Sequence, residues 1–260
     1  MALTPETFAL TDRAAVVTGA AQGIGAAIAI ACARFGADVA IADRDTEGLA
    51  RTGAEIEELG RRVHTGVLDV RDGDAVREWI EPLERVDVLV NNAGGGFAAA
   101  FLDVNDKGQD ALVRENFTSV THCIRACVPK MPATGGSIVN ITSIEAHRAA
   151  PNYAIYTAMK AAVASLTQSL ALELGDRRIR VNCIAPDVIP TPGIGDIPVK
   201  TPLPYPGHVD DVAAAAIYLA SGAARFVTGV TLHVDGGNLA AGGWQRAAGG
   251  GWTTGGEPVV

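Results

Sequence analysis

A tyrosine and a lysine stand four residues apart in the segment Tyr156-Thr157-Ala158-Met159-Lys160. Residues at this spacing share one face of a helix, so the two side chains would lie close together. A tyrosine phenol has an ordinary pKa of about 10, and a neighbouring ammonium lowers that pKa by favouring the phenolate. Such a pair predicts proton transfer to or from a substrate oxygen near neutral pH.

Two further polar residues could complete this chemistry. Ser143 comes just after an apolar segment, and its hydroxyl could hold a carbonyl or alkoxide oxygen. Asn116 lies in a stretch expected to be helical. Taken singly, each has a structural explanation: the serine could end a strand, the asparagine could satisfy buried backbone, and a lone lysine could be a surface residue. As an ordered set with Tyr156 and Lys160, they favour a catalytic site.

A glycine-containing loop, Thr18-Gly19-Ala20-Ala21-Gln22-Gly23-Ile24-Gly25, joins an expected strand to an apolar helical pattern. Glycines in this place let the backbone turn tightly and approach a pyrophosphate, which the free N–H groups of the helix N-terminus bind. An ordinary strand-to-helix turn also uses glycine, but the strand before and the helix after favour a dinucleotide site.

Asp43, at the end of the second expected strand, is positioned to select the cofactor. A carboxylate there can accept both ribose hydroxyls of NAD and would repel the 2′-phosphate of NADP. The next residue, Arg44, could hold that phosphate, but alternation along a strand predicts that it points to the opposite side. NAD(H) is therefore predicted over NADP(H).

Strand-length apolar segments alternate with longer helical patterns from Asp12 to Asp235, as in β-α-β units around a parallel sheet. The expected strands are 14–18, 38–42, 63–68, 86–91, 137–142, 179–184 and 230–234. The expected helices are 24–35, 46–59, 73–83, 107–130, 153–174 and 209–220. We predict one doubly wound α/β Rossmann domain over 1–237, with a seven-stranded parallel sheet and helices on both faces. The uncharged helix 153–174 needs cover on more than one face, which a partner subunit could provide.

Composition excludes several classes of function. The formal net charge is −8 and no run of Lys or Arg occurs, so we expect no nucleic-acid partner and no binding to an anionic membrane. No segment is apolar and long enough to cross a bilayer, and no secretory signal is visible. The four cysteines lie in apolar segments without metal-ligand spacing, which predicts reduced thiols, no metal site and a cytoplasmic location.

The motifs in this order resemble the short-chain dehydrogenase/reductase family over about 225 residues. The resemblance depends on the T-G-x-x-x-G-x-G loop, on Asn91-Asn92-Ala93-Gly94, on Asn116, on Ser143 and on the Tyr156/Lys160 pair. It implies that Tyr156 passes the proton, Lys160 also grips the nicotinamide ribose, Ser143 orients the substrate and Asn116 positions a relaying water. It further implies cofactor contacts by Thr18, Gly19, Gln22, Gly23, Ile24, Gly25, Asp43, Arg44, Asp69, Val70, Asn92, Ala93, Gly94, Tyr156, Lys160, Pro186, Val188 and Thr191. The family also implies a homotetramer.

The sequence departs from the family pattern in two places. Asp187 replaces the glycine that usually follows Pro186, so either its backbone avoids positive φ or an Asp tolerates it. Prolines crowd the region 190–208, which predicts a short, stiff lid. We hypothesise that the tail 238–260, with seven glycines, helps to close the pocket through Trp244 or Trp252, in its own or a neighbouring subunit.

The expected substrate pocket contains Ser143, Glu145, Phe97, Tyr153 and Ile189. Glu145 could repel carboxylate substrates, bind a substrate hydroxyl, or simply lie on the surface. The apolar walls favour a hydrophobic or alicyclic, steroid-like secondary alcohol that is interconverted with its ketone. One alternative is reduction of a 3-oxoacyl thioester on acyl carrier protein, which usually goes with NADPH and a basic surface. An alternative of another class is a non-catalytic dinucleotide sensor.

Overall fold

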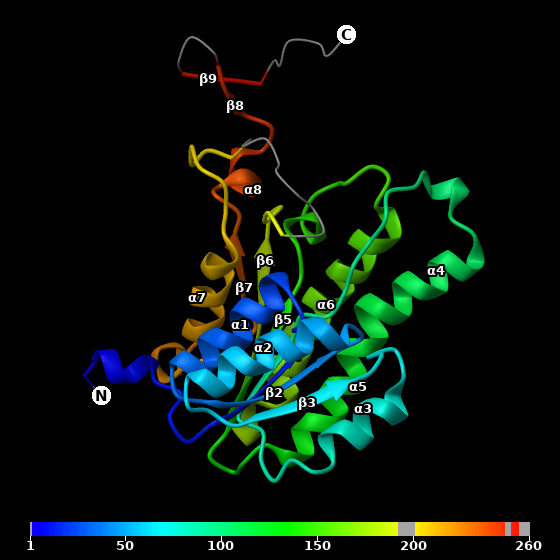
Figure 1. The fold of residues 1–260 in the computed structure, drawn as a ribbon. Coiled ribbons are helices and arrows are strands. Elements are labelled where there is room, and N and C mark those ends of the chain that lie inside the picture. The colour runs from blue at the N-terminus through cyan, green and yellow to red at the C-terminus, as the bar shows by residue number, and fades with distance from the viewer. Residues whose placement is uncertain (1, 192–200, 248–250, 255–260) are drawn as a thin grey trace.

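A computed structural model describes residues 2–191, 201–247 and 251–254. Seven parallel strands form the main sheet, in the order β3-β2-β1-β4-β5-β6-β7 (Figure 1). They are β1 (Ala14–Thr18), β2 (Asp38–Asp43), β3 (Val63–Val67), β4 (Val88–Asn91), β5 (Gly136–Ile141), β6 (Ile179–Pro186) and β7 (Thr231–Val234). The predicted doubly wound sheet is confirmed, and every strand lies within about two residues of its expected range.

Helices cover both faces of the sheet, as the sequence predicts. One layer holds α1 (Gly23–Arg34), α2 (Thr46–Glu58) and α7 (Val209–Ala220), and the other holds α3 (Gly73–Ile80), α5 (Ser119–Cys127) and α6 (Ala154–Glu173). Alternation along β1 separates the two cores: Val17 packs with the first layer and Val16 with the second, and both are fully buried.

The expected single helix 107–130 is wrong in one respect, because it is interrupted. It consists of α4 (Asp106–Val113), a π-helical turn η3 (Arg114–Thr118), α5, and a 3₁₀ turn η4 (Val128–Lys130). In η3 the N–H of Ser119 donates to the carbonyl of Arg114, five residues earlier. The apolar pattern does not reveal such a turn, since widening one turn leaves the helical period on either side intact.

Short elements complete the described chain. The 3₁₀ turns are η1 (Pro5–Phe8), η2 (Phe101–Asp103), η5 (Ile144–Ala146), η6 (Gly175–Arg177) and η7 (Gly222–Ala224). After β7 come α8 (Asn238–Ala241) and an antiparallel pair, β8 (Gln245–Arg246) and β9 (Trp252–Thr253), which extend beyond the end of the sheet (Figure 1). Residues 192–200 of the predicted lid 190–208 lie outside the described residues. None of the helices in the described ranges combines the length and apolarity needed to cross a membrane.

Candidate active site

A cleft of about 880 Å³ opens at the carboxyl ends of the strands. This is where ligands bind in open α/β sheets, because the strand order reverses there and the loops diverge. The predicted site residues that line it are Gly19, Gln22, Gly23, Ile24, Asp43, Arg44, Asp69, Val70, Asn92, Ala93, Gly94, Ser143, Glu145, Tyr153, Tyr156, Lys160, Pro186, Val188, Ile189 and Thr191. The fold thus gathers almost all of the predicted site in one place.

The phosphate loop has the backbone shape that the sequence predicts. Gly19 adopts a φ of +67°, a left-handed conformation, and a Cβ at this position would lie 2.9 Å from the Cα of Ala93. A Cβ on Gly25 would collide with the carbonyl oxygen of Gly19. Gln22, which precedes α1, makes no side-chain capping bond, so the first N–H groups of α1 keep their capacity to bind an anion. A loop this closely packed fits the pyrophosphate of a dinucleotide.

Thr18 and Asn92 support the loop from behind. The N–H groups of Asn92 and Ala93 donate to Thr18 Oγ1, both at 3.1 Å, and Asn92 Nδ2 donates to the carbonyls of Thr18 and Gly19 at 3.1 and 3.0 Å. Thr18 is buried and does not line the cleft. These four bonds tie the end of β1 to the end of β4, so Thr18 positions the loop instead of facing the cofactor.

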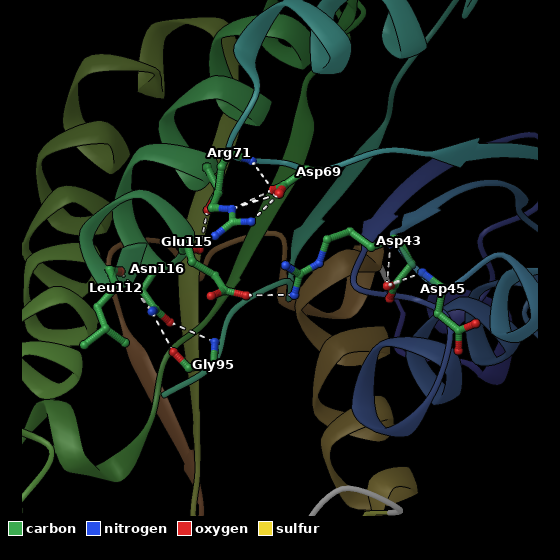
Figure 2. Close-up of polar contacts among 10 residues, drawn as sticks. Asp43, Asp45, Asp69, Arg71, Gly95, Leu112, Glu115 and Asn116 are labelled. Atoms are coloured by element: carbon green, nitrogen blue, oxygen red, sulfur yellow. Dashed lines mark hydrogen bonds and ion pairs between the residues drawn. The ribbon is translucent and has the colours of Figure 1, made fainter. Parts of the chain in front are cut away.

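Asp43 ends β2 with its carboxylate held by backbone donors (Figure 2). Oδ2 accepts from the N–H of Ala21 at 3.1 Å, and Oδ1 accepts from the N–H groups of Arg44 and Asp45 at 2.6 and 3.2 Å. A carboxylate has about four acceptor positions, so about one is left for a ribose hydroxyl. The fixed carboxylate lies where the sequence predicts the ribose-binding acid.

The sequence predicts that Arg44 points away from the cofactor site, and this prediction is wrong. It lines the same cleft as Asp43, and its Nη2 lies 3.4 Å from Oε1 of Glu115 on η3. The physical reason is that β2 ends at Asp43, so strand alternation no longer governs the following residue. Glu115 is a cleft residue that the sequence did not indicate.

Asp69 is held by a partner that the sequence also did not indicate. Arg71 Nε donates to both carboxylate oxygens of Asp69 at 2.9 Å, and its Nη2 lies 2.5 Å from Oδ2 (Figure 2). The hydrogen bonds from Arg71 hold the pKa of Asp69 below its ordinary value. The pair fixes the loop after β3, with Val70 beside it in the cleft wall.

Ser143, Tyr156 and Lys160 come together at the other end of the cleft. Ser143 follows β5 and caps η5, its Oγ accepting from the N–H of Glu145 at 3.1 Å. Tyr156 and Lys160 lie on α6, with the Lys160 Nζ 5.6 Å from the centre of the Tyr156 ring. Lys160 Nζ donates to the carbonyl of Ile141 at 3.0 Å. The end of β5 therefore fixes both Ser143, which follows it, and Lys160, which is bound to its last residue, relative to Tyr156.

The electrostatics of this trio differ from the expectation of a lowered tyrosine pKa. Burial raises the pKa of Tyr156, a hydrogen bond with Ser143 opposes that shift, and the charge of Glu145 adds to it. Burial also lowers the pKa of Lys160 to about 8. Burial thus disfavours the charged form of both groups, and Tyr156 keeps its proton at neutral pH.

Asn116 is fully buried behind the cleft, on the π-helical turn. Its Nδ2 donates to the carbonyls of Gly95 and Leu112 at 2.8 and 3.0 Å, and its Oδ1 accepts from the N–H of Gly95 at 3.1 Å (Figure 2). A Cβ on Gly94 would lie 2.9 Å from Asn116 Oδ1 and 3.0 Å from Lys160 Nζ. The Asn116 amide therefore fixes the segment after β4 close to Lys160. The role of Asn116 in relaying protons stays a prediction.

Charged residues border the substrate end of the cleft. Arg148 donates to Glu145 at 2.8 Å and lies 3.9 Å from Asp187, which also accepts from Asn238 Nδ2 of α8 at 2.6 Å. Asp187 does not adopt a positive φ, so its backbone avoids the conformation for which a glycine would be needed. Its side chain is only 10% exposed, because these partners hold it at the cleft wall. Arg148 and Asn238 carry no motif that sequence reasoning could have used.

Some predicted pocket residues lie apart from the main cleft. Phe97 lines a separate small hollow with Phe101, although Tyr153 borders both spaces. Trp244 and Trp252 are about half exposed and do not line the cleft of their own chain. Closure of the pocket by a tryptophan, in this or a neighbouring subunit, stays a prediction.

A seven-stranded parallel sheet is combined here with a glycine loop after the first strand, an acid at the end of the second strand and a buried Tyr/Lys pair in one cleft, an arrangement typical of a dinucleotide-dependent oxidoreductase. Comparison with known proteins agrees with this class. Residues 19–238 match the family described as enoyl-(acyl carrier protein) reductase. The 3-oxoacyl-[acyl-carrier-protein] reductase of Thermotoga maritima is 36% identical over 241 residues, which cover 88% of this chain and 98% of the relative.

Two solved structures are similar throughout. 7α-Hydroxysteroid dehydrogenase complexed with NADH and 7-oxo glycochenodeoxycholic acid has a TM-score of 0.86 and 32% identity, covering 91% of this chain and 98% of that one. Gluconate 5-dehydrogenase from Burkholderia cenocepacia, in complex with NADP and tartrate, has a TM-score of 0.85 and 34% identity, with the same two coverages. The chain belongs to the short-chain dehydrogenase/reductase family, and it is accordingly a nicotinamide-dependent oxidoreductase of CH–OH groups.

Proposed function

We propose that the chain is an NAD(H)-dependent oxidoreductase that interconverts a neutral secondary alcohol, alicyclic or steroid-like, and its ketone. The observation that carries the choice of cofactor is Asp43, whose carboxylate is fixed by three backbone N–H groups at the cleft wall. A 2′-phosphate placed beside this acid would meet like charge, whereas a ribose hydroxyl would find an acceptor.

When bound, the nicotinamide supplies or accepts the hydride. Tyr156 moves the proton: its Oη donates to the ketone oxygen in reduction and takes the hydroxyl proton in oxidation. Ser143 orients that oxygen beside Tyr156. Lys160 sits close enough to the tyrosine ring to stabilise charge developing on the phenol oxygen, while its bond to Ile141 fixes its position.

The lining of the substrate end supports a neutral substrate with an apolar body. Val188, Ile189 and Ala150 provide an apolar wall, while Glu145 and Asp187 place two carboxylates against the single guanidinium of Arg148. This excess of negative charge would repel a carboxylate substrate, and a carboxylate oxygen could accept from a substrate hydroxyl. A hydroxylated ring system fits this lining, because it has an apolar body, carries no charge and offers a hydroxyl as donor. A homotetramer and a cytoplasmic location stay predictions from the sequence.

The test is a screen that follows absorbance of the reduced nicotinamide, with NAD and NADP tried separately. The panel holds cyclic secondary alcohols, hydroxysteroids, sugar acids and, in the reducing direction, a 3-oxoacyl thioester. We expect turnover of neutral cyclic alcohols with NAD. Preference for NADP would refute the argument from Asp43, and preference for sugar acids would refute the argument from Glu145 and Asp187.

Reduction of a 3-oxoacyl thioester is the second candidate, supported by the relative from Thermotoga maritima. The net charge of −8 disfavours docking of an acidic carrier protein, and Asp43 disfavours NADPH. The thioester arm of the screen decides between the two. A non-catalytic sensor would show nucleotide binding with no turnover of any substrate.

A further inference from the structure

The adenosine end of the cleft carries an ion pair whose members come from separate walls. Arg44 follows β2, and Glu115 lies on η3, after β4 and α4. Figure 2 shows Glu115 and Asp43 well apart, on different elements. Arg44, the residue after Asp43, has its Nη2 3.4 Å from Oε1 of Glu115 and so connects the two walls. Both members line the cleft, so a bound nucleotide would lie against this pair.

Arg44 is the one cation that could meet a 2′-phosphate among the described residues lining this end of the cleft. Lys160, the other lining cation, is at the catalytic end and is bound to Ile141. Arg71 is near, but two of its nitrogens are bound to Asp69. Arg114 donates to the backbone carbonyl of Arg71 and does not line the cleft.

We infer that Glu115 is a specificity-determining residue that disfavours NADP(H) by engaging Arg44. Arginine binds phosphate through its planar fork of N–H groups, and a carboxylate that already contacts one of these nitrogens, as Glu115 does at 3.4 Å, competes with the phosphate. Asp43 would accept from a ribose hydroxyl, and Glu115 withholds the neighbouring guanidinium of Arg44. This inference deepens the proposed function, since it concerns the same choice between NAD(H) and NADP(H).

The size of the effect follows from the exposure of the pair. The side chain of Arg44 is 59% exposed and that of Glu115 is 25% exposed, so water screens the attraction. Ion pairs with such exposure change an equilibrium constant by about 1.4- to 5-fold. Removal of the competing carboxylate also removes a negative charge near the phosphate. We expect a net gain in NADPH affinity of about two- to tenfold for Glu115→Gln.

The experiment measures the dissociation constants of NADPH and NADH by fluorescence titration, which needs no substrate. The variants are Glu115→Gln, Arg44→Gln and the double variant, each compared with the wild type by circular dichroism. Glu115→Gln should lower the Kd for NADPH more than the Kd for NADH. Arg44→Gln should weaken NADPH binding, and in its presence Glu115→Gln should bring a smaller gain, because only the loss of negative charge near the phosphate then remains.

Asp74→Asn is the matched control, because it removes one carboxylate from an exposed Arg77–Asp74 pair that does not line the cleft. It should leave the ratio of the two dissociation constants at the wild-type value. An unchanged ratio in Glu115→Gln, an equal change in Asp74→Asn, or an equal gain with and without Arg44 would each overturn the inference. A wild type that binds NADPH more tightly would refute the proposed cofactor, while the shift caused by Glu115→Gln would still test the role of Glu115.

Discussion

Replacement of Lys160 by methionine should make the protein more stable and abolish its turnover. The lysine is only 5% exposed, and burial lowers its pKa from 10.5 to about 8. Folding at neutral pH must therefore bury a charged ammonium. Methionine has a similar length and carries no charge, so it avoids this cost.

The magnitude follows from the pKa difference. The difference between a pKa of 10.5 in the unfolded chain and about 8 in the folded protein corresponds to a cost of about 3 kcal/mol for burying the charged form. Methionine avoids this cost but also loses the hydrogen bond from Nζ to the carbonyl of Ile141, which lowers the stability of the variant by about 1 kcal/mol. Lys160→Met should thus raise the free energy of unfolding at pH 7 by about 2 kcal/mol.

The pH dependence identifies the cause. Below about pH 8 the lysine is charged in both the folded and the unfolded chain, so the full cost applies. Between about 8 and 10.5 the unfolded chain binds more protons, and the stability of the wild type rises with pH relative to the variant. Above 10.5 the lysine is neutral in both states and the charge cost disappears.

Urea unfolding of wild type and Lys160→Met at about pH 7, 9 and 10.5 provides the measurement. Lys107→Met is the control, because Lys107 is exposed on α4 and should show a change within about 0.5 kcal/mol at every pH. The reasoning fails if Lys160→Met is no more stable than the wild type at pH 7, or if its advantage does not shrink as the pH rises.

Three other changes test the site. Tyr156→Phe should lower kcat by about 10²-fold or more and leave NADH binding measurable by titration, because the proton donor is lost and the cleft is kept; retained turnover would exclude Tyr156 as the acid. Glu145→Gln should shift the acidic limb of alcohol oxidation, where kcat/KM rises with pH as Tyr156 loses its proton, to lower pH, because the charge of Glu145 raises the pKa of Tyr156; an unmoved limb would contradict this. Gly25→Ala should destabilise the fold by about 1–3 kcal/mol, because the added Cβ meets the carbonyl of Gly19. Gly53→Ala on α2 should instead stabilise the fold by up to about 1 kcal/mol, since the nearest atom to its Cβ lies at 3.7 Å. Thermal unfolding measures both changes, and equal effects of the two variants would contradict the packing argument.

Much of the fold was predictable because its local patterns agree with one another. Buried parallel strands require continuous apolar segments, and each such segment is followed by a helical pattern and then another strand. The glycine loop, Asp43 and the Tyr156/Lys160 pair were predictable for a related reason. Their chemistry depends on spacing within one element or at one strand end, and the sequence records both.

Features that depend on contacts between distant segments were not predictable. Glu115 meets Arg44 only because η3 and the end of β2 face the same cleft. The raised pKa of Tyr156 depends on how deeply this tyrosine of α6 is buried, and burial outweighs the opposing hydrogen bond with Ser143. Phe97 precedes the catalytic residues without pointing to the main cleft, because its loop carries it into a separate hollow.

The π-helical turn makes the length of the chain between β4 and β5 part of the site. Each residue of an α-helix turns the following side chains by about 100°, so one residue fewer in η3 would rotate α5 by that angle. Cys123 and Cys127, which α5 now buries in the core, would leave it. A regular helix through this segment could keep Asn116 facing the Gly95 backbone or keep α5 packed, but not both. The position of the asparagine thus depends on the additional residue of the π-helical turn as much as on the asparagine itself.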